Sequence, residues 1–383
     1  MKKLLLLSAS ALLSLSAMAQ VSEPTVKQVW KSDNTVAIPA AADARYGTGF
    51  NEKIYVNDKT NTTLYCYSYD ETTEKVTRSV VSGVAVAAHA ATVDGAGNVI
   101  LPQSFGTAAA MSGGFVVYNP TTGVSNKISV TLPSDYAAGR ADYIGRASGD
   151  VFSAEGGSLF LIGQYNDAKD TRILKVTIKN GTEATTEATV DTKIEWSTAT
   201  IVVPLTNDPT SNEVIIRGRN TGTSSFTYRD NETWTEYKTI GSMSTTAGGD
   251  VVKLNDILYT IEPAKYGDSS TYLDGWQIVD RASNEVVYEH KEETDIRSNS
   301  GYSTALFAQK ISDTKANIYH YHPGAYVAMY TFEVPEVSTA IESVAVDANA
   351  PVEYYNLQGV KVANPENGLF IKKQGNKATK VIL

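Results

Sequence analysis

The sequence predicts an all-β fold, namely a β-propeller of about six blades followed by a small C-terminal β module. Helical periodicity is missing over most of the chain, whereas apolar or alternating runs of about four to eight residues recur between Gly, Asn, Asp, Thr and Ser. These runs form groups that repeat at intervals on the order of 50 residues, which is typical of propeller blades. Two stacked β-sandwiches are the alternative arrangement of the same strands.

The first residues are typical of a cleaved export signal. Lys2 and Lys3 precede an apolar stretch from Leu4 to Leu15, and Ala17-Met18-Ala19 matches an A-x-A cleavage site. The apolar stretch is shorter than the roughly 20 residues that span a bilayer. We therefore expect residues 1–19 to be a signal peptide and the mature chain to be exported.

The first repeat unit shows the order of runs that the later units follow. A cluster of small residues at 45–50 precedes the apolar run 53–56, the aromatic run 63–67 and the polar run 75–80. Their β-branched and aromatic residues favour strands. We expect the small residues to occupy the innermost strand of each blade, where bulky side chains from several blades would collide at the axis.

Five further clusters of small residues open the remaining units. They begin at His89, Arg146, Ser197, Thr245 and Tyr302. We therefore expect six blades between residues 20 and 335, with five or seven as alternatives. The last unit has three clear strands of its own, so the strand at 27–34 is free to complete its blade and close the ring.

The composition changes after Pro335. Residues 336–350 are rich in Val, Ala, Ser and Glu and predict a linker. Residues 351–383 contain four short apolar runs separated by turn residues, which predicts a small β module.

Charge and cysteine content exclude some classes of protein. The formal net charge is −9 and becomes −11 once Lys2 and Lys3 are removed, which argues against binding to nucleic acid or to anionic membranes. Cys66 is the sole cysteine, so the chain has no intrachain disulfide.

A search for catalytic motifs finds no metalloprotease, hydrolase, phosphate-loop or EF-hand pattern. His320 and His322 alternate along one predicted strand and share a face, but two imidazoles need a third ligand to hold zinc or copper. We predict no metal and no cofactor. A pair of glycosidase carboxylates leaves no sequence signature, so whether the protein is an enzyme stays open.

One group of residues predicts a binding site. In a propeller, the loops that enter the inner strands and those that leave the second strands converge on one face around the axis. Here those loops carry cationic, amide and aromatic side chains, which suit an anionic group or the face of a sugar ring. The predicted ligand-binding residues are Arg45, Tyr46, His89, Gln103, Arg146, Gln164, Arg217, Arg219, Lys265, Tyr266, Tyr302 and His322. The alternative is that they are solvated loop residues or partners in structural ion pairs.

The tail is similar to a known family. Its segments 355–362, 367–372 and 377–381 resemble the C-terminal sorting domains of the type IX (Por) secretion system, although Phe370 replaces the usual Tyr and the tail is shorter than those domains. The opening at 44–59 is similar to secreted bacterial propellers of unknown function. The resemblance implies delivery to the outer cell surface, with a periplasmic protein as the alternative.

We therefore expect an exported or cell-surface protein that binds a glycan or a protein ligand such as a peptide at the propeller axis without performing chemistry. An extracellular enzyme that acts on polysaccharide or peptide through axial carboxylates is the competing class, and a purely structural surface protein is a third. A deep axial pocket with two close, pKa-shifted carboxylates would favour the enzyme.

Overall fold

The structure of the chain is a computed structural model. It describes residues 23–103, 114–132, 136–138, 144–165, 167–191, 201–217, 226–230, 233–237, 249–266, 273–292, 305–336, 350–375 and 377–383. The chain divides into two compact units, Met1–Pro335 and Glu336–Leu383.

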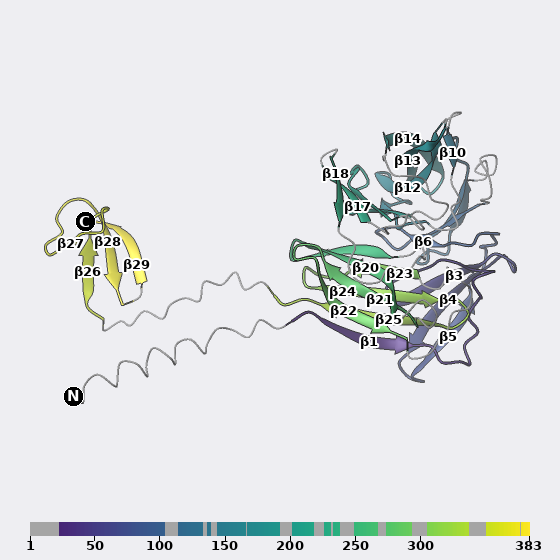
Figure 1. The fold of residues 1–383 in the computed structure, drawn as a ribbon, viewed down its shortest axis with the longest axis horizontal. Helices are drawn as coiled ribbons and strands as arrows, with labels where there is room; N and C mark the ends of the chain where they lie inside the picture. The colour runs from purple at the N-terminus through teal and green to yellow at the C-terminus, as the bar shows by residue number, and fades with distance from the viewer. Residues whose placement is uncertain are drawn as a thin grey trace. The chain divides into compact units, whose positions relative to one another are not determined.

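Six antiparallel sheets make up the described part of the first unit, and each is one blade of a β-propeller (Figure 1). Blade 1 consists of β2 (Gly47–Phe50), β3 (Lys53–Asp58), β4 (Thr63–Asp70) and β5 (Lys75–Val80). Blade 2 consists of β6 (Thr92–Val93), β7 (Val99–Pro102), β8 (Phe115–Tyr118) and β9 (Ser125–Ile128). In both blades the strands follow one another in chain order across the sheet, as the repeat predicts.

Blades 3 to 5 have the same order with one addition. Blade 3 consists of β11 (Ser148–Asp150), β12 (Gly156–Tyr165), β13 (Asp167–Lys179) and β14 (Glu183–Asp191), and β10 (Tyr136–Ala138) pairs with the far end of β12. Blade 4 consists of β15 (Ile201–Pro204), β16 (Val214–Arg217), β17 (Phe226–Asp230) and β18 (Thr233–Tyr237). Blade 5 consists of β19 (Asp250–Leu254), β20 (Ile257–Tyr266), β21 (Leu273–Asp280) and β22 (Glu285–Lys291).

Blade 6 joins the two ends of the first unit. Its strands β23 (Ala305–Lys310), β24 (Lys315–His322) and β25 (Tyr326–Glu333) are completed by β1 (Thr25–Lys31), which pairs antiparallel with β25 from Thr25↔Glu333 to Lys31↔Ala328. The predicted closure of the ring by an N-terminal strand is confirmed, with the strand a few residues earlier than expected.

The first strands of successive blades lie against one another near the axis. The amide of Ala91 donates to the carbonyl of Tyr46 at 3.0 Å, and that of Ala147 donates to the carbonyl of Val93 at 2.8 Å. These bonds connect the inner strands of blades 1, 2 and 3. A closed circle of this kind lets each sheet bury both faces against its neighbours.

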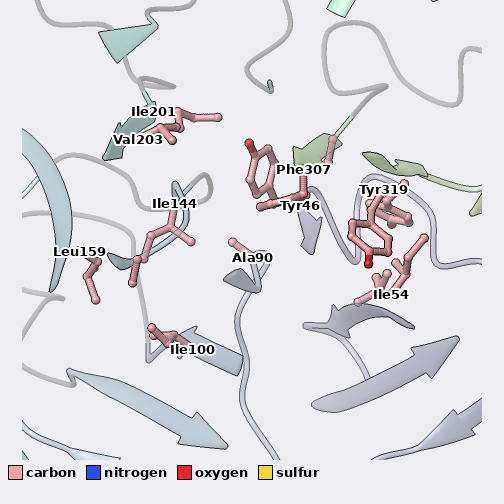
Figure 2. Packing of buried hydrophobic residues seen from close by; sticks show 14 of the residues in the cluster. Tyr46, Ile54, Ala90, Ile100, Ile144, Leu159, Ile201, Val203, Phe307 and Tyr319 are labelled. Carbon is pink, nitrogen blue, oxygen red and sulfur yellow. The ribbon is translucent and has the colours of Figure 1, made fainter. Parts of the chain in front are cut away.

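The largest buried cluster crosses several blades and includes the axis. Tyr46 and Phe307 lie beside each other in Figure 2, with ring centroids 4.9 Å apart, although they belong to blades 1 and 6. The hydroxyl of Tyr46 also donates to the carbonyl of Gly249 at 3.4 Å, next to blade 5. Aromatic rings from different blades therefore pack against each other near the axis.

Small residues in β2 have a different role from the expected one. A Cβ at Gly49 would lie 2.0 Å from Cγ of Tyr319, and one at Gly47 would lie 3.1 Å from Cγ of Tyr321. Both tyrosines belong to β24 of blade 6. The glycines therefore admit the large rings of the neighbouring blade rather than relieving a collision at the axis.

The second unit is a four-stranded antiparallel sheet. Its order is β27 (Lys361–Val362), β26 (Val352–Tyr355), β28 (Leu369–Gln374) and β29 (Lys377–Ile382). Within the described part of this unit no side chain is fully buried. Helices long and apolar enough to cross a membrane are missing from the described residues of the chain.

Candidate axial binding site

A cavity of about 150 Å³ lies at the axis among the inner strands of the blades. Gly49 and Phe50 end β2, Asp94 and Gly95 follow β6, and Lys310 ends β23. Arg146 and Ala147 precede β11, and Asp250 begins β19, so the lining combines residues from both ends of the inner strands. The residues that line it are Gly49, Phe50, Val93, Asp94, Gly95, Arg146, Ala147, Asn207, Asp250, Phe307, Ala308, Gln309 and Lys310.

Arg146 spans the axis and ties three blades together. Its Nε donates to Oδ1 of Asp250 at 3.1 Å, and its Nη2 donates to the carbonyl of Pro204 at 2.8 Å. Arg146 precedes β11 in blade 3, whereas Pro204 ends β15 in blade 4 and Asp250 begins β19 in blade 5. The guanidinium is therefore held in one orientation at the cavity wall.

Asp250 is a buried carboxylate whose oxygens are engaged. Besides the bond from Arg146, Oδ1 accepts the amide of Val251 at 2.8 Å and Oδ2 accepts the amide of Ala308 at 2.9 Å. Burial raises the pKa of Asp250 above its ordinary value, although Arg146 and the two amides oppose the shift. The side chain links blades 3, 5 and 6 at the axis.

Asp94 is the second buried carboxylate of the cavity, in the turn after β6. Oδ1 accepts the amides of Ala96 and Asn98, and Oδ2 accepts Nδ2 of Asn98 and the amide of Val151, at distances of 2.8–3.0 Å. Burial raises the pKa of Asp94 to about 6 against these four bonds. Residues 94–98 form the turn between β6 and β7, and Asp94 also connects this turn to blade 3.

The polar lining also includes side chains from blades 4 and 6. Oδ1 of Asn207 accepts the amide of Gly149 at 2.9 Å, and a Cβ at Gly95 would lie 1.7 Å from the same oxygen. Gln309 accepts the hydroxyl of Tyr319 at 2.6 Å. Gly95 therefore lets the turn of blade 2 approach Asn207 closely, which keeps the cavity small.

The charges around the cavity balance. Asp94 and Asp250 are acidic, Arg146 and Lys310 are basic, and Lys310 also pairs with Asp313 at 2.7 Å. At neutral pH the formal charges of the four lining residues cancel. Because Asp250 pairs with Arg146 and Asp313 pairs with Lys310, the lining offers fixed donors and acceptors and no uncompensated positive charge.

A polar cleft adjoins the cavity between blades 1 and 2. It has a volume of about 480 Å³ and includes Phe50, Lys53, Asn98, Asn119 and Asp150 in its lining. Phe50 lines both the cleft and the axial cavity. Its ring packs over Gly97, where a Cβ would lie 2.3 Å from Cδ1, so a glycine is required beneath it.

Only some of the predicted site residues come together. The amides of Arg45 and Tyr46 both donate to the carbonyl of His89, and Nζ of Lys59 lies 3.0 Å from Nε2 of His89. Tyr46 is fully buried, and Gln103 is half-buried with its Nε2 donating to the carbonyl of Phe115 at 3.2 Å. Arg146 faces the axial cavity.

The remaining predicted residues lie elsewhere or outside the described side chains. His322 is fully buried at the end of β24, between blades 5 and 6. Gln164, Arg217, Lys265 and Tyr266 belong to β12, β16 and β20, of which the backbone is described at these positions. Arg219 and Tyr302 lie outside the described residues.

Sequence reasoning did not find Phe50, Asp250, Gln309 or Lys310. Asp250 is separated from Arg146 by 104 positions in the chain, and no local pattern announces an ion pair over that distance. One signal in the sequence could have pointed to Asp250, which follows Gly248-Gly249 at the start of the fifth unit. A carboxylate on a buried inner strand must find hydrogen-bond partners. Among the described residues, no group of three His, Cys, Asp or Glu side chains has the geometry of a metal site.

Six sheets around an axis, closed by the N-terminal strand, define the class of the protein as a six-bladed β-propeller. No known family profile matches the chain, and a search of curated proteins finds no relative.

Solved structures similar to this chain are distant from it. A gluconolactonase from Xanthomonas campestris is 9% identical, with 82% of this chain and 96% of that chain covered and a TM-score of 0.44. A protein of unknown function from Dyadobacter fermentans is 11% identical, with 81% and 99% covered and a TM-score of 0.45. TolB from Acinetobacter baumannii is 11% identical, with 78% and 63% covered and a TM-score of 0.39. The assignment to the propeller class rests on the sheet topology of the chain itself.

Proposed function

We propose that the protein is an exported binding protein whose axial cavity receives a neutral polar group, such as the terminal sugar ring of a glycan. The observation that carries this proposal is the engagement of both axial carboxylates. Asp94 accepts four hydrogen bonds and Asp250 accepts three, all from groups of the protein itself. Carboxylates held in this way act as fixed structural acceptors.

The charge balance supports a neutral ligand over the anionic group suggested by the sequence. Arg146 is neutralised by Asp250, and Lys310 has Asp313 as a partner. An anion in this cavity would lose water and gain little net attraction. A sugar hydroxyl both donates and accepts, which matches a wall of mixed donors and acceptors.

The size of the cavity supports recognition of a chain end. About 150 Å³ is less than the roughly 300–1,000 Å³ of sites that enclose a whole small molecule. The adjoining cleft of about 480 Å³ provides room for further residues of the same ligand. Phe50, which lines both spaces, supplies an aromatic surface on which a sugar ring stacks.

The competing enzyme hypothesis is supported by the raised pKa of both axial carboxylates, Asp94 and Asp250. Burial raises the pKa of Asp94 to about 6, a value that suits a general acid. However, a general acid must give its proton to a substrate, and both oxygens of Asp94 face donors of the protein. Binding is therefore the function that the geometry supports better.

The proposed location is outside the cytoplasm. The charged and apolar segments at 2–15 with the cleavage pattern at 17–19 support export, and the similarity of the tail to sorting domains supports residence at the outer cell surface.

The binding proposal is tested with the mature chain on an array of neutral and acidic oligosaccharides, followed by calorimetry on the best ligand. Phe50→Ala is expected to weaken binding about fivefold, because an aromatic stacking surface contributes on the order of 1 kcal/mol. Phe152→Ala is the matched control, since Phe152 is half-buried like Phe50 but lines neither the cavity nor the cleft.

Three results would contradict the proposal. Equal weakening by Phe50→Ala and Phe152→Ala would place the ligand elsewhere. Binding restricted to acidic oligosaccharides and abolished by Lys310→Met would indicate an anion site. Cleavage of a bound oligosaccharide that Asp94→Asn abolishes would establish the enzyme.

A further inference from the structure

A cluster of histidines lies at the seam between blades 5 and 6, apart from the axial cavity. His320 and His322 of β24 are fully buried, and their ring centroids are 6.0 Å apart. His290 of β22 in blade 5 lies 6.2 Å from His320 and stacks on Trp276 at 5.5 Å. Three imidazoles therefore meet where two blades pack together.

A chain of hydrogen bonds crosses this seam. Nε2 of His290 lies 3.3 Å from Oε1 of Glu292, and the hydroxyl of Tyr326 donates to the same oxygen. The oxygen of Tyr326 is also 3.1 Å from Nδ1 of His320. Because the hydroxyl proton goes to Glu292, His320 must donate from Nδ1, and its Nε2 is then the unprotonated nitrogen.

Three buried ring nitrogens of the cluster make no hydrogen bond of good geometry within the described residues, namely Nε2 of His320 and both nitrogens of His322. The backbone of Pro323 lies close to His322 and favours its protonated form. His322 instead stacks on the ring of Tyr326 with centroids 5.5 Å apart. A buried polar atom without a partner is costly, so these imidazoles are a weak point of the interface.

The surroundings disfavour protonation of His320 and His322 in the closed seam. Lys31 of β1 lies 3.7 Å from the centre of the Tyr326 ring, and Tyr288 and Tyr330 also face the cluster. Burial lowers the pKa of His322 to about 4, against the opposing effect of the Glu292 carboxylate. Burial and then the neighbouring His322, His290 and Lys31 lower the pKa of His320 well below its ordinary value.

We propose that this cluster is an acid-sensitive latch that holds the end of β22 against blade 6. His290, Glu292 and Tyr326 line a surface groove of about 720 Å³, through which water reaches the edge of the cluster. When the end of β22 separates from Tyr326, the buried imidazoles become hydrated and bind protons near pH 6.5. Acid therefore favours the open seam.

The direction and size of the effect follow from proton linkage. A histidine whose pKa is lower in the closed state than in the open state stabilises the closed state at a pH above the open-state pKa. This stabilisation is lost as the pH falls from the open-state pKa toward the closed-state pKa. Between pH 7 and pH 5 the opening equilibrium rises about 25-fold through His322 alone, given pKa values near 6.5 open and about 4 closed. His320 acts in the same direction.

The test is hydrogen exchange of the mature chain at pH 7 and pH 5, with rates corrected for intrinsic exchange. In the wild type, opening of β22 and β25 is expected to rise at least about 25-fold at pH 5, while β3 and β4 of blade 1 stay unchanged. In His320→Phe/His322→Phe the rise is expected to disappear. His89→Phe, which changes a half-buried histidine of blade 2 beside Lys59, is expected to keep it.

Two outcomes would overturn the latch. One is a rise that is equal in blade 1 and at the seam. The other is a rise that persists at β22 in the double variant. If the double variant does not fold, His322→Phe alone decides the question, because it leaves the bond between Tyr326 and His320 in place. His322→Phe must then reduce, by about 25-fold, the increase in opening of β22 that the wild type shows between pH 7 and pH 5.

Discussion

Single residues at the axis connect blades that are far apart in the sequence. Arg146 reaches blades 4 and 5, and Asp250 accepts the amide of Ala308 in blade 6. Each blade of a propeller packs mainly on its two neighbours, so bonds that skip a blade resist shear of the whole ring. The Arg146–Asp250 pair is thus expected to contribute to stability as well as to the shape of the cavity.

Removal of Arg146 should destabilise the protein strongly. In Arg146→Met the carboxylate of Asp250, which is 2% exposed, loses its cation, and we expect a loss of about 3 kcal/mol in the free energy of unfolding. The double variant with Asp250→Asn should recover about 1–2 kcal/mol, because no buried charge is then unpaired. Urea-induced unfolding followed by tryptophan fluorescence measures both.

The control for this pair is Lys253→Met. Lys253 pairs with Asp256 at 3.4 Å, but both side chains are exposed, so its loss should change stability little. Equal effects of Arg146→Met and Lys253→Met would contradict a structural role for the axial ion pair.

At the same scale, the sequence predicted little of the candidate site. Arg146 was predicted to line a binding pocket, with a structural ion pair as the alternative; it lines the axial cavity, and Asp250 and Pro204 hold its guanidinium. Tyr46 was expected at a binding surface and is packed against Phe307 instead. Local patterns show which residues begin a strand. They do not show which side chains meet across the axis, since that depends on the shifts of six sheets relative to one another.

At the scale of elements, the sequence was more informative. The alternation of apolar and polar residues marked most strands, and the incomplete last unit predicted that an N-terminal strand would join it. The pairing of β1 with β25 confirms this prediction. It is predictable because an edge strand with exposed backbone groups requires a partner. The strand β10 was missed, since its three residues carry no such pattern.

The closing strand should be replaceable by a separate peptide. A chain that begins at residue 32 lacks β1, leaves the edge of β25 unpaired and uncovers core around Trp30, which is 4% exposed in the intact protein. We expect this chain to aggregate or unfold, and a peptide of residues 23–34 to restore the native circular dichroism spectrum. A peptide of the same composition in scrambled order is the control. Restoration by both peptides would show that register with β25 is unimportant.

At the scale of the whole molecule, the sequence predicted the fold class well but left the number of blades open. The repeat of about 50 residues indicated a propeller, but insertions between strands left five to seven blades open. Sheet pairing settles the count at six within the described residues. The second unit has its own sheet of four strands and its own hydrogen bonds, such as Gly368 to Leu383 at 2.9 Å.

Loss of the tail should therefore alter location rather than stability. Deletion of residues 337–383 is expected to leave the thermal unfolding midpoint of the propeller unchanged, because the first unit is compact by itself. If the tail is a working sorting signal, the same deletion moves the protein from the surface fraction of the producing cells to the periplasmic fraction. An unfolding midpoint lowered by several degrees would contradict the independence of the two units.

The pairing of Thr25 with Glu333 has a consequence for how such a ring is made. For a polypeptide threaded through a membrane with its amino end leading, the earliest strand to emerge is the last to find its neighbour, because that neighbour arrives more than three hundred positions later. Contacts between such distant positions form slowly. If this chain is exported as proposed, the ring stays open until translocation is almost complete, and the pairing of β1 with β25 forms only after the chain has left the membrane.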